Sequence, residues 1–210
     1  MLYLIGGPPR TGKTTLATAL ARRTSCPYLS IDHIAQVIVP YIPERDHPAR
    51  LPLRVARQDT HFSNDLFYDT YSAEQSVDLY LRQAETCWPG VEHFIKYALQ
   101  DDHALILEGW QILPHRLRDV IAPADRMRIV FLYKRSVVDI AAGLRSHAAE
   151  IDWVRKNTKI EGTFDAIASM IGCFGAVIER DATANGFQTV NTDHNFADTI
   201  ERTVASLLSC

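Results

Sequence analysis

Short apolar runs recur along the chain, separated by longer segments in which apolar residues repeat at helical spacing. Five runs are too short to be helices. Several of them are continuously apolar, which is typical of strands in a parallel sheet covered on both faces. The runs are residues 2–5, 28–31, 104–107, 129–133 and 187–190. Because parallel strands need crossover connections, the pattern predicts helices between them.

The segments between the runs provide the expected helices. Residues 13–23 follow the first run, and the segment that begins at Phe164 keeps helical spacing as far as Ile178. Phe196 and Leu208 lie on the apolar face of the last expected helix. This alternation predicts an α/β fold, in which ligands bind beyond the carboxyl ends of the strands.

The gap between the second and third strands, residues 33–103, is too long for a single crossover helix and predicts a helical insertion. Its first part, residues 40–57, contains four prolines and four arginines, which favours a stiff loop leading into a helix. Its second part, residues 73–99, has the spacing of one or two helices, with a break expected near Pro89 and Gly90.

Composition and charge narrow the possible classes of protein. The chain has 210 residues, of which 47% are hydrophobic and 22% charged, so one compact domain, residues 1–210, is expected, and disordered and collagen-like chains are excluded. A formal net charge of −3 provides no general attraction to nucleic acid or anionic lipid, and we expect neither as a partner.

The cysteines and the apolar runs indicate a cytoplasmic protein. The four cysteines form no CxxC pair, and their spacing fits neither a zinc site nor a disulfide framework. No apolar run approaches the roughly 18 residues of a membrane span, and no basic segment precedes the apolar N-terminal stretch. We therefore expect no membrane partner.

A phosphate-binding motif follows the first strand. Residues 7–14 match the pattern G-x-x-x-x-G-K-[ST] in full, with a predicted strand before the motif and a predicted helix after it. Glycines let backbone amides turn around an anion, and the helix that begins near Lys13 adds the positive end of its dipole. The residues expected to bind a nucleoside triphosphate are Gly7, Pro8, Pro9, Arg10, Thr11, Gly12, Lys13, Thr14 and Thr15.

The side chains of the motif suggest separate roles. We expect Lys13 to reach the β- and γ-phosphates, Thr14 to coordinate Mg²⁺ through its hydroxyl, and Thr15 to add a hydroxyl contact. The alternative is a glycine turn capped by a helix, which would leave Lys13 there without a partner.

Two carboxylates follow the second and third predicted strands. Asp32, after the second strand, faces the expected γ-phosphate and is a candidate to accept the proton of an attacking hydroxyl; the alternative is a helix N-cap. Glu108 ends the third strand, and its role is open between the magnesium shell and contact with the acceptor; the alternative is a carboxylate in solvent. The expected catalytic residues are Lys13, Asp32, Glu108 and Arg145.

With these residues the chain resembles, along its whole length, the small P-loop kinases of the nucleoside/nucleotide and shikimate kinase-like group. Residues 6–10 and 107–114 also resemble stretches of 2-phosphoglycerate kinase-like proteins. The resemblance implies a three-layer P-loop NTPase fold with a five-stranded parallel sheet in the order 2-3-1-4-5. It also implies a lid at about residues 134–160 and a loop near the adenine at residues 191–193, with a cap of the last helix as the alternative for this loop. The implied activity is that of an ATP- and Mg²⁺-dependent phosphotransferase acting on a hydroxyl of a small, possibly anionic, metabolite such as 2-phosphoglycerate.

Basic and aromatic residues supply candidates for the lid and for the acceptor site. Arg145, Arg155 and Lys156 are able to close on the transferring phosphoryl group, although such residues also solvate helix faces. The arginines of residues 45–57 are able to bind an anionic acceptor or to remain in solvent. The residues expected at the acceptor are Asp32, His33, Arg54, Arg57 and Trp110, with a polar loop role for His33 and core packing for Trp110 as the alternatives.

Two departures from family patterns affect the choice of substrate. Ala35 stands where nucleotide kinases of this group commonly have an arginine, which disfavours a nucleoside monophosphate acceptor. Asn191-Thr192-Asp193 does not match the N-K-x-D pattern that reads guanine, so ATP is the expected donor. A nucleotide-binding switch or accessory ATPase with a protein partner, and a nucleoside or nucleotide kinase, remain as alternatives. The acceptor and the oligomeric state are not fixed by the sequence.

Overall fold

A five-stranded parallel sheet forms the centre of the computed structural model, which describes residues 1–100, 104–120, 126–146 and 153–209. The strand order is β2-β3-β1-β4-β5, as the resemblance implied, and each neighbouring pair is parallel. The strands are β1 (Leu2–Gly6), β2 (Tyr28–Ser30), β3 (Leu105–Gly109), β4 (Met127–Tyr133) and β5 (Gln188–Asn191). All five runs predicted as strands are therefore confirmed, with bounds that shift by one or two residues.

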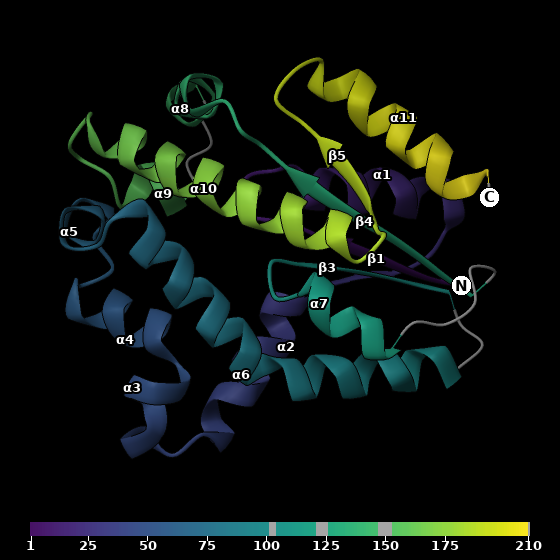
Figure 1. The fold of residues 1–210 in the computed structure, drawn as a ribbon, viewed down its shortest axis with the longest axis horizontal. Helices are drawn as coiled ribbons and strands as arrows, with labels where there is room; N and C mark the ends of the chain where they lie inside the picture. The colour runs from purple at the N-terminus through teal and green to yellow at the C-terminus, as the bar shows by residue number, and fades with distance from the viewer. Residues whose placement is uncertain (101–103, 121–125, 147–152, 210) are drawn as a thin grey trace.

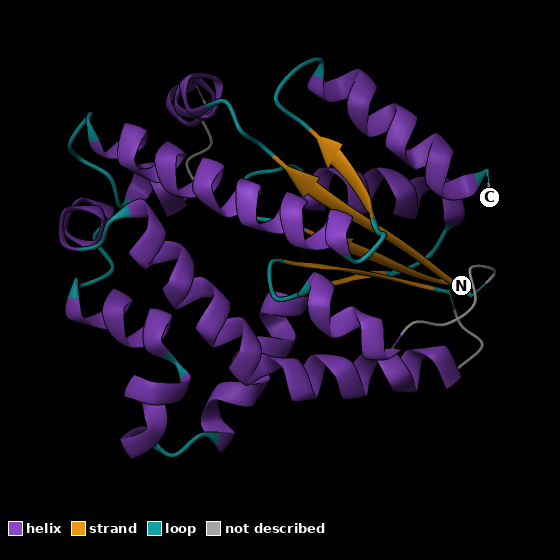
Figure 2. Cartoon of the chain, in the orientation of Figure 1, coloured by secondary structure: helices purple, strands orange, loops and turns teal. Residues whose placement is uncertain are grey.

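Side chains of the central strand alternate between two cores. Leu2 and Leu4 belong to the core on one face, which includes residues of α6 (Ala73–Gln100) and α10 (Thr163–Ala184), whereas Tyr3 and Ile5 belong to the other. The second core includes residues of the helices at the beginning and end of the chain. These are α1 (Lys13–Thr24) and α11 (Phe196–Leu208). Helices thus cover both faces of the strands, which gives the predicted three-layer arrangement (Figure 2).

The segment between β2 and β3 is almost entirely helical. It begins at the carboxyl end of β2 and leads into the long helix α6 (Figure 1). Its elements are α2 (Ile31–Ile38), η1 (Val39–Tyr41), η2 (Glu44–Asp46), α3 (His47–Arg50), α4 (Pro52–Asp59), α5 (Asn64–Thr70) and α6. Residues 40–50 therefore form short helical turns where a stiff loop was expected, and the helix that this segment was expected to lead into is α4. Residues 101–103 of the expected insertion lie outside the described residues.

Helix α6 continues through Pro89, so the break expected there is wrong. Proline removes one hydrogen bond inside a helix and crowds the preceding turn, which bends a helix more often than it ends one when the flanking residues are packed. Cys87, Trp88 and Val91 are buried around the proline, and Figure 1 shows the helix changing direction part-way along its length. Core packing on both sides of Pro89 thus keeps one helix.

The remaining elements lie after β3 and after β4. They are α7 (Pro114–Leu117), η3 (Arg118–Val120), α8 (Val137–Ser146) and α9 (Trp153–Lys156). The expected lid, residues 134–160, includes α8 and α9, and its residues 147–152 lie outside the described residues. Within the described part of the chain, no helix combines the length and the apolar character needed to cross a membrane.

Candidate nucleotide and acceptor site

The loop between β1 and α1 has the backbone shape that its glycines permit. Gly7, Arg10 and Gly12 have φ values of 134°, 67° and 94°, in the region that L-residues with side chains rarely adopt. A Cβ atom on Gly7 would lie 2.1 Å from the carbonyl oxygen of Leu132 in β4, and one on Gly12 would lie 2.6 Å from the ring of Phe196. Both glycines of the motif are therefore required by conformation and by packing.

Lys13 is held inside this loop. Its side chain is buried, with 8% of its surface exposed, and its ammonium group donates a hydrogen bond to the carbonyl oxygen of Pro8 at 2.7 Å. Burial lowers the pKa of Lys13, while the nearby carboxylates of Glu108 and Asp32 act in the opposite direction. Lys13 therefore has a backbone hydrogen-bond partner and nearby carboxylates. The alternative of a capped glycine turn predicted a lysine without a partner, which differs from this arrangement.

Thr14 and Glu108 place two oxygen ligands beside Lys13. The Thr14 hydroxyl donates to Oε1 of Glu108 at 3.3 Å, and Glu108 is 5% exposed. Glu108 belongs to β3, where it pairs with Ile5 of β1 and Ser30 of β2, so the alternative of a carboxylate in solvent is wrong. Hydroxyl and carboxylate oxygens are the ligands that Mg²⁺ prefers, and these residues fit a Mg²⁺ ion bound together with nucleotide phosphates.

Asp32 lies in the first turn of α2, next to the same group of residues. Ser30, not Asp32, is the N-cap of this helix, because the Ser30 hydroxyl accepts a hydrogen bond from the Asp32 backbone N–H at 3.4 Å. The Asp32 carboxylate is exposed and accepts a hydrogen bond from Nε2 of Gln111 at 2.7 Å. The structure thus brings Lys13, Asp32 and Glu108 together from three neighbouring strand ends.

A cavity of about 470 Å³ opens beside the motif. One wall consists of Arg10, Gly12, Lys13, Thr14 and Thr15. The opposite wall combines the residue after β4, residues of α8 and the first residue of α11. These are Lys134, Asp139, Ile140, Gly143, Leu144, Ser146 and Phe196. All of these except Phe196 belong to residues 134–160, the segment expected as a lid, but none was predicted individually as a site residue. Lys134 follows a strand as Asp32 does, and this position was a usable signal.

The loop after β5 contacts both the phosphate-binding motif and the segment that leads into α8. Thr192 is fully buried, and its hydroxyl donates to the carbonyl oxygen of Thr11 at 2.9 Å. Asp193 accepts hydrogen bonds from the backbone N–H groups of Arg135 and Ser136, at 2.8 and 3.2 Å, just before α8 begins. Residues 191–193 therefore lie against the motif and against the start of α8. Their expected position near the adenine stays a prediction.

Several of the expected basic and aromatic residues have partners within the fold. Arg145 forms ion pairs with Glu161 and with Asp165, the latter at 2.9 Å. Trp110 packs edge-to-face on Tyr80 of α6, with ring centroids 4.9 Å apart. Arg145 therefore has acidic partners just beyond the expected lid segment, one of them in α10. Trp110 takes the core packing that the sequence kept as an alternative. Their direct roles at the phosphoryl group and at the acceptor stay predictions.

Arg57 lies in an aromatic environment between α4 and α5. Its guanidinium carbon is 3.7 Å from the centre of the Phe67 ring, and its nitrogens donate to Oδ1 of Asn64 and to the Tyr68 hydroxyl. These contacts hold two helices together. Arg54 belongs to the same helix, and its Nε is buried with no hydrogen-bond partner among the described residues. His33 is exposed on α2.

Gln111 also lies at the site, although the sequence did not predict it as a site residue. It is 1% exposed, and its amide contacts Asp32 directly. Gln111 follows β3 by two residues, and a glutamine within a run of apolar residues was the only sequence signal. Such a residue is recognised as part of a site only when its spatial partner is known.

Comparisons with known proteins agree with this architecture. Residues 3–61 match a family model described as ATPase family associated with various cellular activities (AAA), and no curated protein matches the chain. Similar solved structures include a sugar kinase from Janibacter sp. HTCC2649, with 16% identity and a TM-score of 0.53, covering 97% of this chain and 92% of that chain. Another is shikimate kinase from Acinetobacter baumannii in complex with shikimate, with 18% identity and a TM-score of 0.50, covering 99% and 92%. This chain therefore has the P-loop NTPase fold that these two kinase structures share.

Proposed function

We propose that the protein is an ATP-dependent phosphotransferase that moves the γ-phosphoryl group of ATP to a hydroxyl of a small metabolite. One observation carries the proposal: Glu108 is hydrogen-bonded to Thr14, next to Lys13, and pairs in the sheet with Ser30, two residues before Asp32. The buried Lys13 and the exposed Asp32 therefore flank the same strand end. A phosphate-binding cation and a potential proton acceptor thus occupy the carboxyl ends of β1 and β2. This pairing is what transfer from a nucleotide to a hydroxyl requires.

The chain's own residues supply the steps of this reaction. Lys13 neutralises negative charge on the γ-phosphate. Thr14 and Glu108 would hold Mg²⁺, which would supply further charge neutralisation when bound. Asp32 accepts the proton of the acceptor hydroxyl. The hydroxyl oxygen then forms a bond to the γ-phosphorus as the bond from that phosphorus to the β–γ bridging oxygen breaks, and ADP leaves.

The cavity beside the motif supports ATP as the donor. Arg10, Lys13 and Lys134 are basic residues that line it, and its apolar residues include Leu144 and Phe196. Burial lowers the pKa of Lys134, and the carboxylates of Asp193 and Asp139 oppose this effect. Cationic groups next to apolar side chains suit a ligand with a charged and a flat apolar part.

Charges near Asp32 support an anionic acceptor. Burial, and after it the charge of Asp32, raise the pKa of the Cys87 thiol to about 11, while the charge of Arg50 acts in the opposite direction, so both charges act on the same thiol. Arg54 adds a buried Nε without a hydrogen-bond partner among the described residues. An acceptor carboxylate or phosphate would satisfy these arginines. We propose a hydroxylated acid as the acceptor class, with 2-phosphoglycerate as one candidate because residues 107–114 resemble 2-phosphoglycerate kinase-like proteins.

An accessory ATPase with a protein partner is the second candidate, favoured by the match of residues 3–61 to the AAA family model. A nucleotide kinase is less favoured, because Ala35, where an arginine was expected for such an acceptor, lies in the core with 6% of its surface exposed.

The test follows the γ-phosphoryl group. Purified protein is incubated with γ-labelled ATP, Mg²⁺ and a panel of hydroxylated acids and sugars that includes 2-phosphoglycerate and shikimate. We expect label on an organic acceptor, and none in a Lys13→Met control that excludes contaminating kinases. Label found only as inorganic phosphate, at a rate independent of every compound, would overturn the proposal in favour of the ATPase.

A further inference from the structure

Gln111 holds one side of the Asp32 carboxylate. Its Nε2 donates to Oδ1 of Asp32 at 2.7 Å, across a separation of 79 residues in the sequence. Among the described residues no hydrogen bond reaches the second carboxylate oxygen, Oδ2. One oxygen of Asp32 is therefore fixed by the protein, and the other is available to an incoming hydroxyl.

This contact comes with an unfavourable one. The other amide atom of Gln111, Oε1, is buried and has no hydrogen-bond partner among the described residues. An unpaired buried carbonyl oxygen destabilises the folded protein, because it has lost its hydrogen bonds to water without gaining a replacement. Rotating the amide by half a turn would place this oxygen against the negative carboxylate of Asp32, so the observed orientation is the favourable one.

The neighbouring backbone makes room for this amide. A Cβ atom on Gly109 would lie 2.7 Å from Oε1 of Gln111 and 2.8 Å from Cβ of Ile31. Glycine at the end of β3 thus lets the glutamine lie between the strand and α2. An apolar side chain of the same length would fill this space without leaving a polar atom unpaired. Packing alone therefore does not account for a glutamine here.

Within the described part of the chain, the bond from Gln111 is the only hydrogen bond to the Asp32 carboxylate. Asp32 lies in the first turn of α2, where Ser30 already caps the helix, and its carboxylate is exposed. An exposed aspartate in a first helical turn samples several rotamers, and only some of them face the Lys13 ammonium. The hydrogen bond from Gln111 selects among these rotamers.

We propose that Gln111 is a positioning residue for phosphoryl transfer: it orients Asp32 so that Oδ2 faces the acceptor hydroxyl, at the expense of an unpaired buried oxygen. This inference rests on the proposed function. Misplacing a reacting group by about 1 Å lowers rates by up to roughly 10²-fold, which sets the size of the expected effect.

The test uses Gln111→Met, which keeps the length of the side chain and removes both polar atoms. We expect the affinity for Mg²⁺-ATP to be unchanged, kcat to fall about 10–100-fold, and Tm to equal or exceed that of the wild type. A purely structural glutamine would give the reverse, with a lower Tm and an unchanged kcat, and this result would overturn the proposal.

Gln83→Met is the matched stability control. Oε1 of Gln83 accepts a hydrogen bond from the Arg54 backbone N–H at 2.9 Å. The corresponding oxygen of Gln111 has no hydrogen-bond partner among the described residues. We expect Gln83→Met to lower Tm by a few degrees, about what the loss of one hydrogen bond gives in a chain of this size. If Gln111→Met lowered Tm by as much as Gln83→Met or more, this result would contradict the claim that the unpaired Oε1 of Gln111 destabilises the protein.

A double-mutant cycle separates positioning through Asp32 from a general effect. In an Asp32→Asn background we expect Gln111→Met to change kcat by less than about threefold, because the residue it orients is already inactive. Full additivity of the two substitutions would overturn the inference.

Failure of the proposed function is distinguishable from failure of this inference. If the wild-type protein labels no organic acceptor, the proposed function fails. The position of the Asp32 carboxylate in crystal structures of the wild type and Gln111→Met then decides the inference by itself. We expect a different Asp32 rotamer in the variant, and an unchanged rotamer would overturn the positioning role.

Discussion

Thr14 and Glu108 lie 94 residues apart in the sequence, and the hydroxyl of one donates to the carboxylate of the other at 3.3 Å. The two residues come from the first turn of α1 and from the end of β3. A hydroxyl that donates its proton to a carboxylate directs its lone pairs elsewhere, which suits a metal ligand. In the proposed site, Glu108 would therefore act on Mg²⁺ through Thr14 as well as through its own charge.

We expect Glu108→Gln to weaken the use of Mg²⁺ while leaving the fold intact. Residues that orient a metal ligand typically contribute about 10–100-fold to metal affinity, so the Mg²⁺ concentration for half-maximal activity should rise by roughly that factor. Titrating activity with Mg²⁺ at saturating ATP measures the effect. An unchanged Mg²⁺ requirement would remove Glu108 from the metal shell.

The same substitution should change the pH dependence. Burial lowers the pKa of Lys13, and the charge of Glu108 opposes that effect, so Glu108→Gln should lower this pKa further. Since Lys13 acts as the protonated ammonium, activity declines as pH rises through its pKa. The alkaline limb of the pH profile should therefore move to lower pH in Glu108→Gln, and a limb at the same pH would contradict this coupling.

Removing the ammonium of Lys13 should abolish transfer without unfolding the protein. Lys13→Met keeps the apolar stem and loses the charge that faces the γ-phosphate. Losing one such charged contact in the transition state lowers kcat by at least about 10²–10³-fold. Steady-state kinetics measures the loss, and circular dichroism checks the fold. Near wild-type turnover would contradict the proposed site.

Asp32→Asn should separate ATP binding from catalysis. The amide keeps the shape of the carboxylate but cannot accept the hydroxyl proton, a function worth about 10²–10⁴-fold in rate. We expect the affinity for Mg²⁺-ATP, measured by calorimetric titration, to persist while turnover collapses. Weaker nucleotide binding with normal turnover of the bound complex would instead identify Asp32 as a magnesium-shell residue and make Glu108 the better candidate for activating the acceptor.

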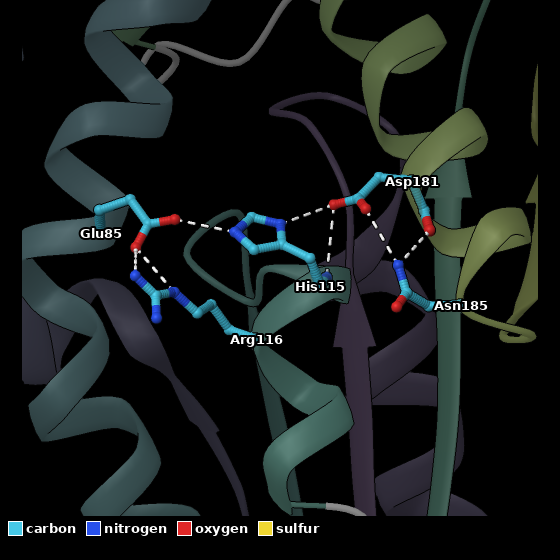
Figure 3. A network of polar contacts seen from close by, with 5 residues as sticks. All are labelled: Glu85, His115, Arg116, Asp181 and Asn185. Carbon is cyan, nitrogen blue, oxygen red and sulfur yellow. Dashed lines mark hydrogen bonds and ion pairs between the residues drawn. The ribbon is translucent and has the colours of Figure 1, made fainter.

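A polar network around His115 links the two large helices on one face of the sheet (Figure 3). The two ring nitrogens of His115 lie 2.8 Å from Glu85 of α6 and 2.8 Å from Asp181 of α10, and Arg116 pairs with the same Glu85. Asn185 donates to the other oxygen of Asp181. Burial opposes protonation of His115, but the hydrogen bonds to Asp181 and Glu85 outweigh it and raise the pKa of His115 above its usual 6.5.

This network should make stability depend on pH. Because the pKa of His115 is higher in the folded chain, its contribution is fully present below about pH 6.5, the unfolded value, and is lost as pH rises through the folded value. The side chain is 47% exposed, so we expect no more than about 1 kcal/mol, or a few degrees in Tm. Thermal unfolding of the wild type and His115→Gln across this range measures the difference. A Tm difference that grows with rising pH would have the wrong sign.

Substitution of Arg57 tests whether this residue stabilises the fold or binds the acceptor. Its contacts with Phe67, Asn64 and Tyr68 predict that Arg57→Met lowers the free energy of unfolding by about 1–3 kcal/mol. Chemical denaturation measures this loss, and the KM for the acceptor should change little. An increased KM with unchanged stability would instead support the acceptor contact that the sequence predicted.

The sequence by itself determined the elements whose signal is local. Short apolar runs, several of them continuous, predicted all five strands, because a strand buried on both faces, such as β1, requires apolar residues at successive positions. The phosphate-binding loop was equally clear, since Gly7 and Gly12 are the residues that its positive φ values demand, and Lys13 and Thr14 follow at fixed spacing. Asp32 and Glu108 were found because both follow strands, where ligands of such folds bind.

Only the tertiary structure decided which side chains meet. Glu108 is buried because β3 lies between β1 and β2, and Gln111 reaches Asp32 because α2 passes over the end of β3. Lys134 and Phe196 line the cavity because β4 and α11 border the motif in space. Contacts of this kind depend on strand order and helix packing, which act between residues far apart in the chain. A local pattern of hydrophobic and polar residues therefore does not predict these contacts.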